Sequence, residues 1–492
     1  MSASTDMKTN MSTKNMSRRR KKKKGIVETW ITIGIFVALF FGMIIYFGLY
    51  VKNNEQELIS NNYNSRTKLL AKENTRGSIY DRNGNVIAET VINESGKEVR
   101  SYPYDALFCH AVGFSTKGRT SIESAANYYL INSNVSIAEK AENDMAGRKN
   151  PGNNVYTTYD ANLQKIASDS LGMFKGAIVV SDVKTGEILA MVSKPDFDPN
   201  YVADNWDKYL ANADGSSALL NRATQGIYPP GSTFKIVTAL EYIRENPDTY
   251  SNYSYNCGGA YRNGDIHINC FHGSVHGTVD FKKSFAKSCN SSFANIGMSI
   301  DKDKYGKTLD ELLFNTSLPL DCNYTVSNLE VDNKVSDDDM VQISIGQGKA
   351  GITPIQLNMI TNAIANDGVV MKPIMIDHIE DAHGNVIKEN EASEYATLLT
   401  ASEAAAMKEL MTAVVNEGTG SKLQSEYYQA AGKTGSAEFG GGASDSHAWF
   451  TGFAPVDDPK VSVTIIVESV GTGGEYAVPI AKRLIDAYFG VY

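Results

Sequence analysis

The chain has 492 residues, of which 42% are hydrophobic, and its net charge is -9. This length predicts a large core and two domains. Basic residues are concentrated in residues 1–24, so the rest of the chain is acidic, which argues against nucleic acid as a partner.

An uncharged segment follows this basic tail. Residues 29–51 carry no charged side chain, and at about 1.5 Å per residue they span roughly 34 Å, enough to cross a bilayer. Trp30 and Tyr50 lie near its ends, where aromatic rings prefer the membrane interface. Because a positive flank stays on the cytoplasmic side, we predict a disordered cytoplasmic tail (1–24), a transmembrane signal-anchor helix (25–51) and an extracytoplasmic remainder. A cleaved signal peptide is the alternative, but its apolar core is usually shorter.

Residues 52–165 mix short strands and helices and predict a smaller domain near the membrane. The Asn-Gly turn within residues 81–85, flanked by apolar residues, predicts a hairpin in this domain.

The pattern of apolar and polar residues changes after residue 165. Apolar strands at 176–193 and again near the C-terminus flank a long helical section, which predicts one sheet built from both ends of a domain over 166–492. The segment 479–489 predicts a final amphipathic helix with Pro479 in its first turn.

A serine and a lysine begin the apolar run "STFKIVTAL". Ser232 and Lys235 are three residues apart, so they share one helix face, and a lysine whose pKa is lowered by burial can activate a serine. The first N–H groups of the helix can bind a developing oxyanion, and Gly231 leaves room for a substrate. Four other Ser-x-x-Lys pairs occur in the chain, and Ser232 could instead be a simple helix cap.

Two further polar motifs follow in order. In "SCN", the Ser288 hydroxyl can relay a proton and Asn290 can bind a substrate amide, although a polar loop is the plainer interpretation. In "AGKTGSAE", Lys433 and Thr434 can bind a carboxylate from an edge strand, Gly435 leaves room for a ligand, and the Ser436 N–H can complete an oxyanion hole. A second Lys-Thr-Gly, residues 184–186, lies in a polar turn between strands and predicts a hairpin instead.

The cysteines are few and odd in number. An odd, low count does not predict a disulfide scaffold. Cys257 and Cys270 flank a Gly-rich segment, and a disulfide between them is one alternative outside the cytoplasm. A zinc site formed by these two with His267 and His272 is another, although the spacing fits no common zinc pattern. The five cysteines are Cys109, Cys257, Cys270, Cys289 and Cys322.

The ordered set S-x-x-K, S-x-N, K-T-G resembles the signature of class A β-lactamases and penicillin-binding proteins. Cys289 stands where the best-known version has Asp. The segments "RGSIYDRNGNVIA", "TTYDANLQ", "NRATQGIYPPGSTFK", "SIGQGKAGITPIQL" and "HAWFTGFAP" resemble class B penicillin-binding proteins, the peptidoglycan D,D-transpeptidases of division and elongation. The resemblance covers nearly the whole chain after the membrane span.

This resemblance implies an α+β transpeptidase domain, a five-stranded antiparallel sheet with helices on both faces, preceded by a transmembrane helix and a mixed, non-catalytic pedestal. It implies that Ser232 attacks the penultimate D-alanine of a stem peptide, that Lys235 activates it, that Ser288 shuttles the proton, and that β-lactams acylate the same serine. It implies no cofactor and no metal in this chemistry. The residues that it implies for substrate binding are Asn290, Lys433, Thr434, Gly435 and Ser436.

By the same resemblance, the expected partner is a polytopic membrane glycosyltransferase of the shape, elongation, division and sporulation group. Two rival functions share the motif set. One is a hydrolase, either a D,D-carboxypeptidase or a β-lactamase, which does not need the pedestal motif that begins at Arg76. The other is a non-enzymatic β-lactam sensor or scaffold, and sensors usually carry several membrane spans.

Overall fold

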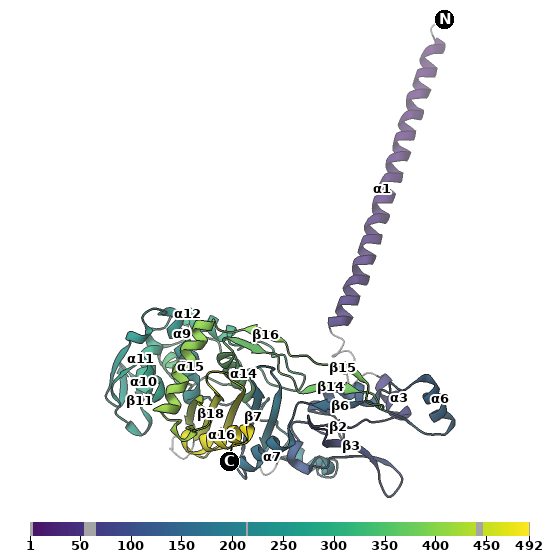
Figure 1. Cartoon of the computed structure of the whole chain (residues 1–492). Helices are drawn as coiled ribbons and strands as arrows, with labels where there is room; N and C mark the ends of the chain where they lie inside the picture. Colours follow the sequence, from purple (N-terminus) through teal and green to yellow (C-terminus); the bar gives the residue numbers. More distant parts are fainter. Residues whose placement is uncertain (1–2, 54–64, 213–214, 439–445, 492) are drawn as a thin grey trace. The chain divides into compact units, whose positions relative to one another are not determined.

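The computed structural model describes residues 3–53, 65–212, 215–438 and 446–491. The chain divides into two compact units, Met1–Ser65 and Arg66–Tyr492 (Figure 1). In the first unit, helix α1 runs over Ala3–Asn53. Its segment Met16–Val51 has a mean hydropathy of 2.3, so among the described helices this one is long and apolar enough to cross a membrane.

The prediction of a disordered basic tail is wrong where the structure describes it, because α1 already begins at Ala3. The tail contains Lys, Arg, Met and Ala, which are all good helix formers. Extending an existing helix adds a hydrogen bond per residue without a new nucleation cost. The apolar helix therefore continues backwards through the basic run.

The second unit is built around a five-stranded sheet with the order β17-β18-β19-β7-β8. Every neighbouring pair is antiparallel, and β7 from the early part of the chain pairs with β19 from the late part. This confirms the predicted sheet formed by both ends of the domain. Its strands are β7 (Gly176–Asp182), β8 (Ile188–Lys194), β17 (Ala431–Glu438), β18 (Ser446–Ala454) and β19 (Val461–Val467).

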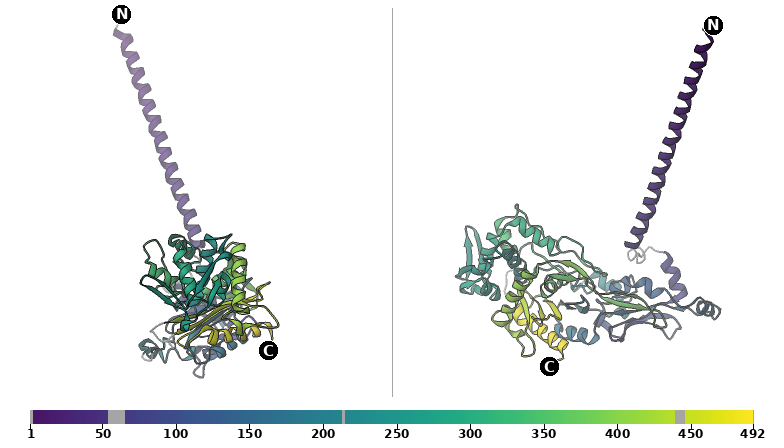
Figure 2. Two further views of the ribbon diagram at one scale, coloured as in Figure 1. Left: turned by 90° about the vertical axis from the view of Figure 1, so that its left-hand side faces the viewer. Right: turned by 45° about the horizontal axis from the view of Figure 1, so that its top comes forward.

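Helices cover both faces of this sheet (Figures 1 and 2). Ala177 and Val179 of β7 pack in one core, which includes α14 (Pro354–Ala365). Ile178 and Val180 pack in the other core, with α7 and α16. Because successive side chains of a strand point to opposite faces, a strand buried on both faces is apolar throughout. The helices of the second face are α7 (Ala161–Leu171) and α16 (Gly473–Phe489).

The section between β8 and β17 supplies most of the remaining helices. Helix α15 packs along the edge strand β17, and the short helix η3 packs on β17 and β18. The helices are α8 (Trp206–Ala211), η3 (Gly231–Phe234), α9 (Lys235–Glu245), α10 (Phe281–Ala286), α11 (Asn290–Ser299), α12 (Lys302–Glu311), α13 (Asp337–Ser344) and α15 (Ala401–Asn416). Short paired strands are β9 (Ser254–Cys257) with β12 (Gly277–Asp280), β10 (Ala260–Asn263) with β11 (Ile266–Asn269), and β13 (Val369–Met371) with β16 (Glu394–Thr397).

A second sheet, the pedestal sheet, has six strands in the order β15-β14-β6-β2-β3-β4. The predicted hairpin is present, since β2 pairs with β3 across the Asn-Gly turn. β14 and β15 come from inside the range 166–492, yet they pair with β6 and complete this sheet. The strands are β2 (Ile79–Tyr80), β3 (Val86–Ile92), β4 (Glu98–Ser101), β6 (Asn154–Thr157), β14 (Ile376–Glu380) and β15 (Val386–Glu389).

Smaller elements surround the pedestal sheet. Strands β1 (Asn74–Thr75) and β5 (Asn150–Pro151) form a parallel pair. The neighbouring helices are α3 (Ser65–Glu73), α4 (Ser121–Ala125), α5 (Asn127–Ile131) and α6 (Ile137–Met145).

A buried carboxylate ties the pedestal together. Glu123 accepts hydrogen bonds from Arg76 Nε at 2.8 Å and from Arg100 Nε at 2.7 Å, and its side chain has no exposed surface. The Tyr102 hydroxyl donates to the same carboxylate at 3.2 Å. Although burial alone raises the pKa of Glu123, the charges and hydrogen bonds of the two arginines hold that pKa at about 2. The arginine of the "RGSIYD" motif is therefore a buried structural anchor.

The prediction for the C-terminal helix is wrong at its start. Helix α16 begins at Gly473, so Pro479 lies inside it and not in its first turn. A Cβ on Gly473 would lie 2.1 Å from the Trp449 carbonyl oxygen, so close packing requires glycine at this position. Glycine is a poor helix former, and this hid the true start of the helix in the sequence.

Candidate active site

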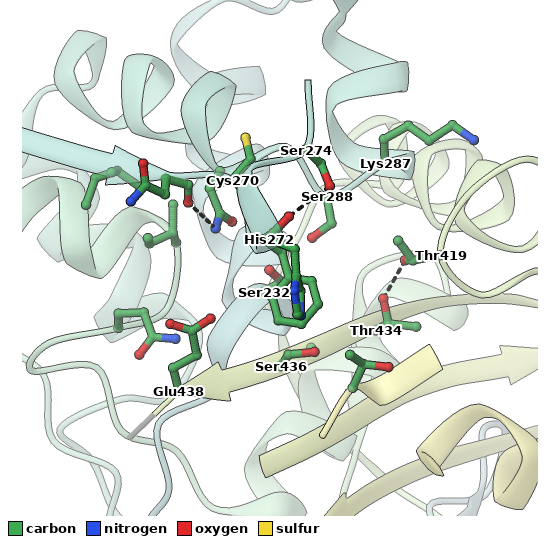
Figure 3. Close-up of a pocket in the computed structure, with 18 of the residues that line it drawn as sticks. Ser232, Cys270, His272, Ser274, Lys287, Ser288, Thr419, Thr434, Ser436 and Glu438 are labelled. Atoms are coloured by element: carbon green, nitrogen blue, oxygen red, sulfur yellow. Dashed lines mark hydrogen bonds between the residues drawn. The ribbon is translucent and has the colours of Figure 1, made fainter. Parts of the chain in front are cut away.

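A cavity of about 1130 Å³ opens beside the edge strand β17 (Figure 3). The three motifs converge on it from different elements: η3 with α9, the loop before α11, and β17. Lys235 and Lys433 have no exposed surface and lie beneath its wall. The motif residues that line the cavity are Ser232, Ser288, Asn290, Thr434, Gly435 and Ser436.

Ser232 lies on a tight turn that is fixed from two sides. Gly231 has a φ of 53°, in the left-handed region, and its N–H donates to the Gly346 carbonyl at 2.9 Å. The indole Nε1 of Trp449 donates to the Pro229 carbonyl at 3.1 Å. Ser232 lies inside η3, whose N-cap is Pro230, and the N-cap of α9 is Phe234, so Ser232 is not the simple cap that was the alternative interpretation. The turn instead holds the Ser232 hydroxyl at the cavity.

The two glycines of the motifs serve packing between η3 and β17. A Cβ on Gly231 would lie 2.7 Å from the Ser436 carbonyl oxygen, and a Cβ on Gly435 would lie 2.9 Å from the Pro230 carbonyl oxygen. Contacts this short do not occur in a relaxed structure, so both positions need glycine. The absent side chains therefore let the serine turn lie directly on the edge strand, a reason that differs from the predicted room for a ligand.

Lys235 is the first residue of α9, and its amine is surrounded by protein. Its Nζ donates to the Ser288 carbonyl at 2.7 Å, to Asn290 Oδ1 at 2.7 Å and to Ser288 Oγ at 3.2 Å. Burial lowers the pKa of Lys235 to about 7. Among the described residues no hydrogen bond joins this amine to the Ser232 hydroxyl. The Lys235 amine thus contacts Ser288 and Asn290 and not Ser232.

Ser288 stands between two lysines. Lys433 Nζ donates to Ser288 Oγ at 3.0 Å and to the Thr434 carbonyl at 3.0 Å. Burial and the nearby charge of Lys235 lower the pKa of Lys433. Two buried ammonium groups on one hydroxyl repel each other, so a single positive charge on the pair is favoured. Ser288 also has a φ of 56°, a strained conformation of the kind that clusters at functional sites.

Further cavity residues were not predicted from the sequence. The Thr419 hydroxyl hydrogen-bonds Thr434, and both line the cavity, as do Lys287 and His272 (Figure 3). Asn290 donates through Nδ2 to the Asn269 carbonyl at 3.0 Å, so both ends of its amide are already bonded to protein. Thr419 has no sequence signal of its own, because only the packing of α15 on β17 brings it to the motif.

The decoy motif is confirmed as hairpin chemistry. Residues 184–186 form the turn between β7 and β8, where Asp182 Oδ1 accepts from the Lys184 N–H at 2.8 Å and the Thr185 N–H at 2.9 Å. These contacts are those of a turn and not of a ligand site.

The cysteines match neither of the two alternatives that the sequence left open. The five cysteines are buried and none forms a disulfide. His267 and His272 are both exposed. His267 faces outward on β11, where its neighbour Ile268 is buried. The alternative zinc set therefore fails in both histidines. Cys257 and Cys270 instead lie beside His276 and Cys289.

The fold and the site define a class. A serine on a turn against the edge of an antiparallel sheet, with two buried lysines sharing a serine hydroxyl, is the arrangement of penicillin-recognising serine acyltransferases. Residues 176–486 match the penicillin binding protein transpeptidase domain, and residues 76–155 match the penicillin binding protein A dimerisation domain. The chain belongs to the penicillin-binding proteins. This confirms the family predicted from the sequence.

Individual relatives agree with this assignment. The chain is 31% identical to the peptidoglycan D,D-transpeptidase PbpA of Mycolicibacterium smegmatis over 454 residues, which cover 86% of this chain and 91% of the relative. It is 29% identical to the peptidoglycan D,D-transpeptidase MrdA of Acinetobacter baumannii over 79% of this chain and 65% of that one.

Solved structures show the same fold. The D,D-transpeptidase domain of a peptidoglycan glycosyltransferase from Eggerthella lenta superposes with a TM-score of 0.77 at 28% identity, over 85% of this chain and 99% of that one. Penicillin-binding protein A of M. tuberculosis, as its ceftriaxone acyl-enzyme complex, gives a TM-score of 0.76 at 27% identity, over 85% and 99% of the two chains. The predicted fold class is confirmed.

Proposed function

We propose that this protein is a serine-type peptidoglycan D,D-transpeptidase, as the sequence predicted. The observation that carries the proposal is the Ser288 hydroxyl bonded to both Lys235 and Lys433 in the wall of the cavity that Ser232 also lines. This arrangement supplies a base, a proton relay and a nucleophile at one place.

The first half-reaction forms an ester. The Ser232 Oγ attacks the carbonyl carbon of the penultimate D-alanine of a stem peptide. The proton of the Ser232 hydroxyl passes through the Ser288 hydroxyl to the neutral amine of Lys235, which is bonded to Ser288. The C–N bond then breaks, and the leaving terminal D-alanine takes that proton on its amine. In the second half-reaction the amine of a neighbouring stem peptide attacks the ester carbonyl carbon. The C–O bond to Ser232 breaks, and the proton that the amine loses passes through Lys235 to Ser232 Oγ, which restores the hydroxyl.

The edge of β17 binds the substrate backbone. The N–H groups of Ser232 and Ser436 form the oxyanion hole, as the sequence predicted. Thr434 binds the terminal carboxylate in the cavity, and the buried Lys433 behind it supplies positive charge that attracts this carboxylate. The carboxylate in turn favours the charged form of Lys433 at the moment when Lys235 must be neutral. Asn290 orients the Lys235 amine, to which its Oδ1 is bonded, and contacts the substrate amide.

A fluorescent penicillin tests the nucleophile. We expect it to label the purified full chain, and Ser232→Ala to abolish the label because the proposed ester forms on Ser232 Oγ. Ser299→Ala is the matched control, since Ser299 also precedes a lysine by three residues but its hydroxyl donates to the Ile296 carbonyl. A label that persists in Ser232→Ala overturns the site assignment.

The lifetime of the adduct separates this function from its hydrolase rival. A transpeptidase keeps the penicilloyl ester for many minutes, whereas a β-lactamase releases it quickly. With a stem-peptide donor and an amine acceptor, the transpeptidase forms the cross-linked product, and a D,D-carboxypeptidase releases D-alanine without it. Release without cross-linking at saturating acceptor contradicts the proposal.

The apolar segment of α1 supports a membrane anchor. From the basic flank we propose a single-pass topology with the N-terminus in the cytoplasm, the pedestal (52–165) and the transpeptidase domain (166–492) outside, and a polytopic membrane glycosyltransferase as partner. External protease on spheroplasts tests the topology, because it should digest the transpeptidase domain and spare an N-terminal tag. Cross-linking from α1 and the pedestal tests the partner.

A further inference from the structure

The cavity carries opposite charges in different parts of its wall. Lys433 is buried beneath the wall and donates to the Thr434 carbonyl, next to the proposed binding place of the donor's terminal carboxylate. Among the described residues that line the cavity, Glu438 is the only acidic one. Glu438 is exposed, and Figure 3 shows its carboxylate on the opposite side of the cavity from the Lys287 amine. The cavity therefore has a negative site away from its positive one.

The strand β17 sets the spacing between these two places. Thr434, Ser436 and Glu438 are alternate residues of this strand, so their side chains share one face, and all three line the cavity. At about 3.4 Å per residue, Glu438 lies roughly 14 Å along the strand from Thr434 and roughly 7 Å from Ser436. β17 is an edge strand of its sheet. A peptide that pairs antiparallel with this edge and ends at Thr434 therefore passes Glu438 with the residues that precede its scissile bond.

The Glu438 carboxylate is available to a ligand. Among the described residues, no basic side chain pairs with it and no group donates a hydrogen bond to it. Residues 439–445, "FGGGASD", contain no basic residue either. Other exposed acids of this domain do have such partners: Asp339, for example, pairs with Lys349 at 2.9 Å. The counterion of Glu438 can therefore come from the substrate.

The proposed reaction places a matching charge on the donor. Donor and acceptor are copies of one stem peptide, and the acceptor contributes a side-chain amine, so an unreacted donor carries the same amine. The two terminal D-alanines have no side-chain amine, so this group precedes the scissile bond. An alkyl amine has an ordinary pKa of about 10.4 and is protonated at neutral pH. The donor thus carries an ammonium upstream of its terminal carboxylate, in the order in which Glu438 and Thr434 are met along the edge of β17.

We propose that Glu438 is a specificity-determining residue that binds the side-chain ammonium of the donor stem peptide. This inference rests on the proposed function. It follows that the site prefers donors whose amine is free, because an amine that has already been cross-linked is an uncharged amide. The acceptor amine is a poorer occupant, since it must lose its proton to attack and a carboxylate favours its charged form.

Acylation of the purified full chain in detergent, without any acceptor, tests the proposal. The probes are a penicillin whose acyl side chain ends in a primary amine and the N-acetyl derivative of the same penicillin. We expect the amine to acylate the wild-type chain about three- to tenfold faster, the range of a single partly exposed ion pair. This ratio of rates should fall to about 1 in Glu438→Gln and below 1 in Glu438→Lys. Because a ratio is measured, a smaller active fraction in a variant does not affect the result.

Glu475→Gln is the matched control. Glu475 is exposed and follows the lining residue Gly474, but it does not line the cavity, so its loss should leave the ratio as in the wild type. The wild-type ratio should also shrink between about 50 mM and about 500 mM salt, because salt screens an exposed ion pair.

Three results would overturn the proposal: equal rates for the two penicillins, a ratio that Glu438→Gln leaves unchanged, or an effect of Glu438→Gln confined to the acceptor step. Acylation by neither penicillin would instead overturn the proposed function, and this inference with it. The two failures are therefore distinguishable.

Discussion

Lys235 should give the acylation rate a distinctive pH profile. Burial lowers its pKa from the ordinary 10.5 to about 7. A shift of about 3.5 units corresponds to about 5 kcal/mol between the charged and neutral forms. At pH 7 about half of the chains then hold Lys235 as a base, compared with roughly one in 3000 at the ordinary pKa. The amine is neutral above its pKa, so the rate should rise with pH.

The measurement is the second-order rate of acylation by a fluorescent penicillin between pH 5 and pH 10. We expect a rise of about tenfold per pH unit below pH 7 and a plateau above about pH 8. Lys235→Arg stays protonated and should lose about 10²–10⁴ in rate. Lys302→Arg, at the decoy Ser299 motif, should keep the wild-type profile. A rate that climbs steadily to pH 10, or that is flat from pH 5 to pH 8, would refute the reasoning.

Three further predictions follow from the geometry. Gly231→Ala and Gly96→Ala both place alanine at a positive φ, which should lower the free energy of unfolding by about 1–2 kcal/mol in each variant. Only the Cβ at position 231 collides with the β17 backbone, so only Gly231→Ala should also lower the acylation rate, by about 100-fold. Glu123→Gln should lower the free energy of unfolding, measured in urea, by about 3–5 kcal/mol, whereas the exposed control Glu142→Gln should change it little. Because the pKa of Glu123 is held at about 2, its stabilisation should disappear as pH falls from 4.5 towards 2. Ser288→Ala and Ser288→Gly should both lose about 10²–10⁴ in acylation rate, but the glycine variant should be about 1 kcal/mol more stable, because it relieves the backbone strain; equal stability of the two would contradict the strain.

Local sequence patterns predicted many of the elements of the fold. The uncharged span predicted the apolar helix, and the apolar runs predicted β7, β8, β18 and β19, because burial on both faces of a sheet leaves a direct mark on composition. The start of α16 was missed for the opposite reason. Gly473 belongs to no local sequence pattern that signals a helix start, since its role is a close contact with a distant strand.

The candidate site divides in the same way. The residue types and their order in the chain indicated Ser232, Lys235, Ser288 and Lys433 without any structure. The sequence did not place Ser288 between the two lysines, and the expected contact of Lys235 with Ser232 is replaced by contacts with the "SCN" loop. Sequence spacing determines neighbours within one helix, whereas contacts between elements depend on how the sheet and helices pack.

The sequence by itself determined the anchor segment, the family and the identity of the motif residues, because each depends on composition or on order along the chain. The tertiary structure decided which distant segments lie together. The hairpin of β14 and β15 completes the pedestal sheet, and His276 and Cys289 lie beside Cys257 and Cys270. Periodicity reports only the immediate surroundings of a residue. Chain segments that are far apart come together through long-range packing, and no local pattern encodes that pairing.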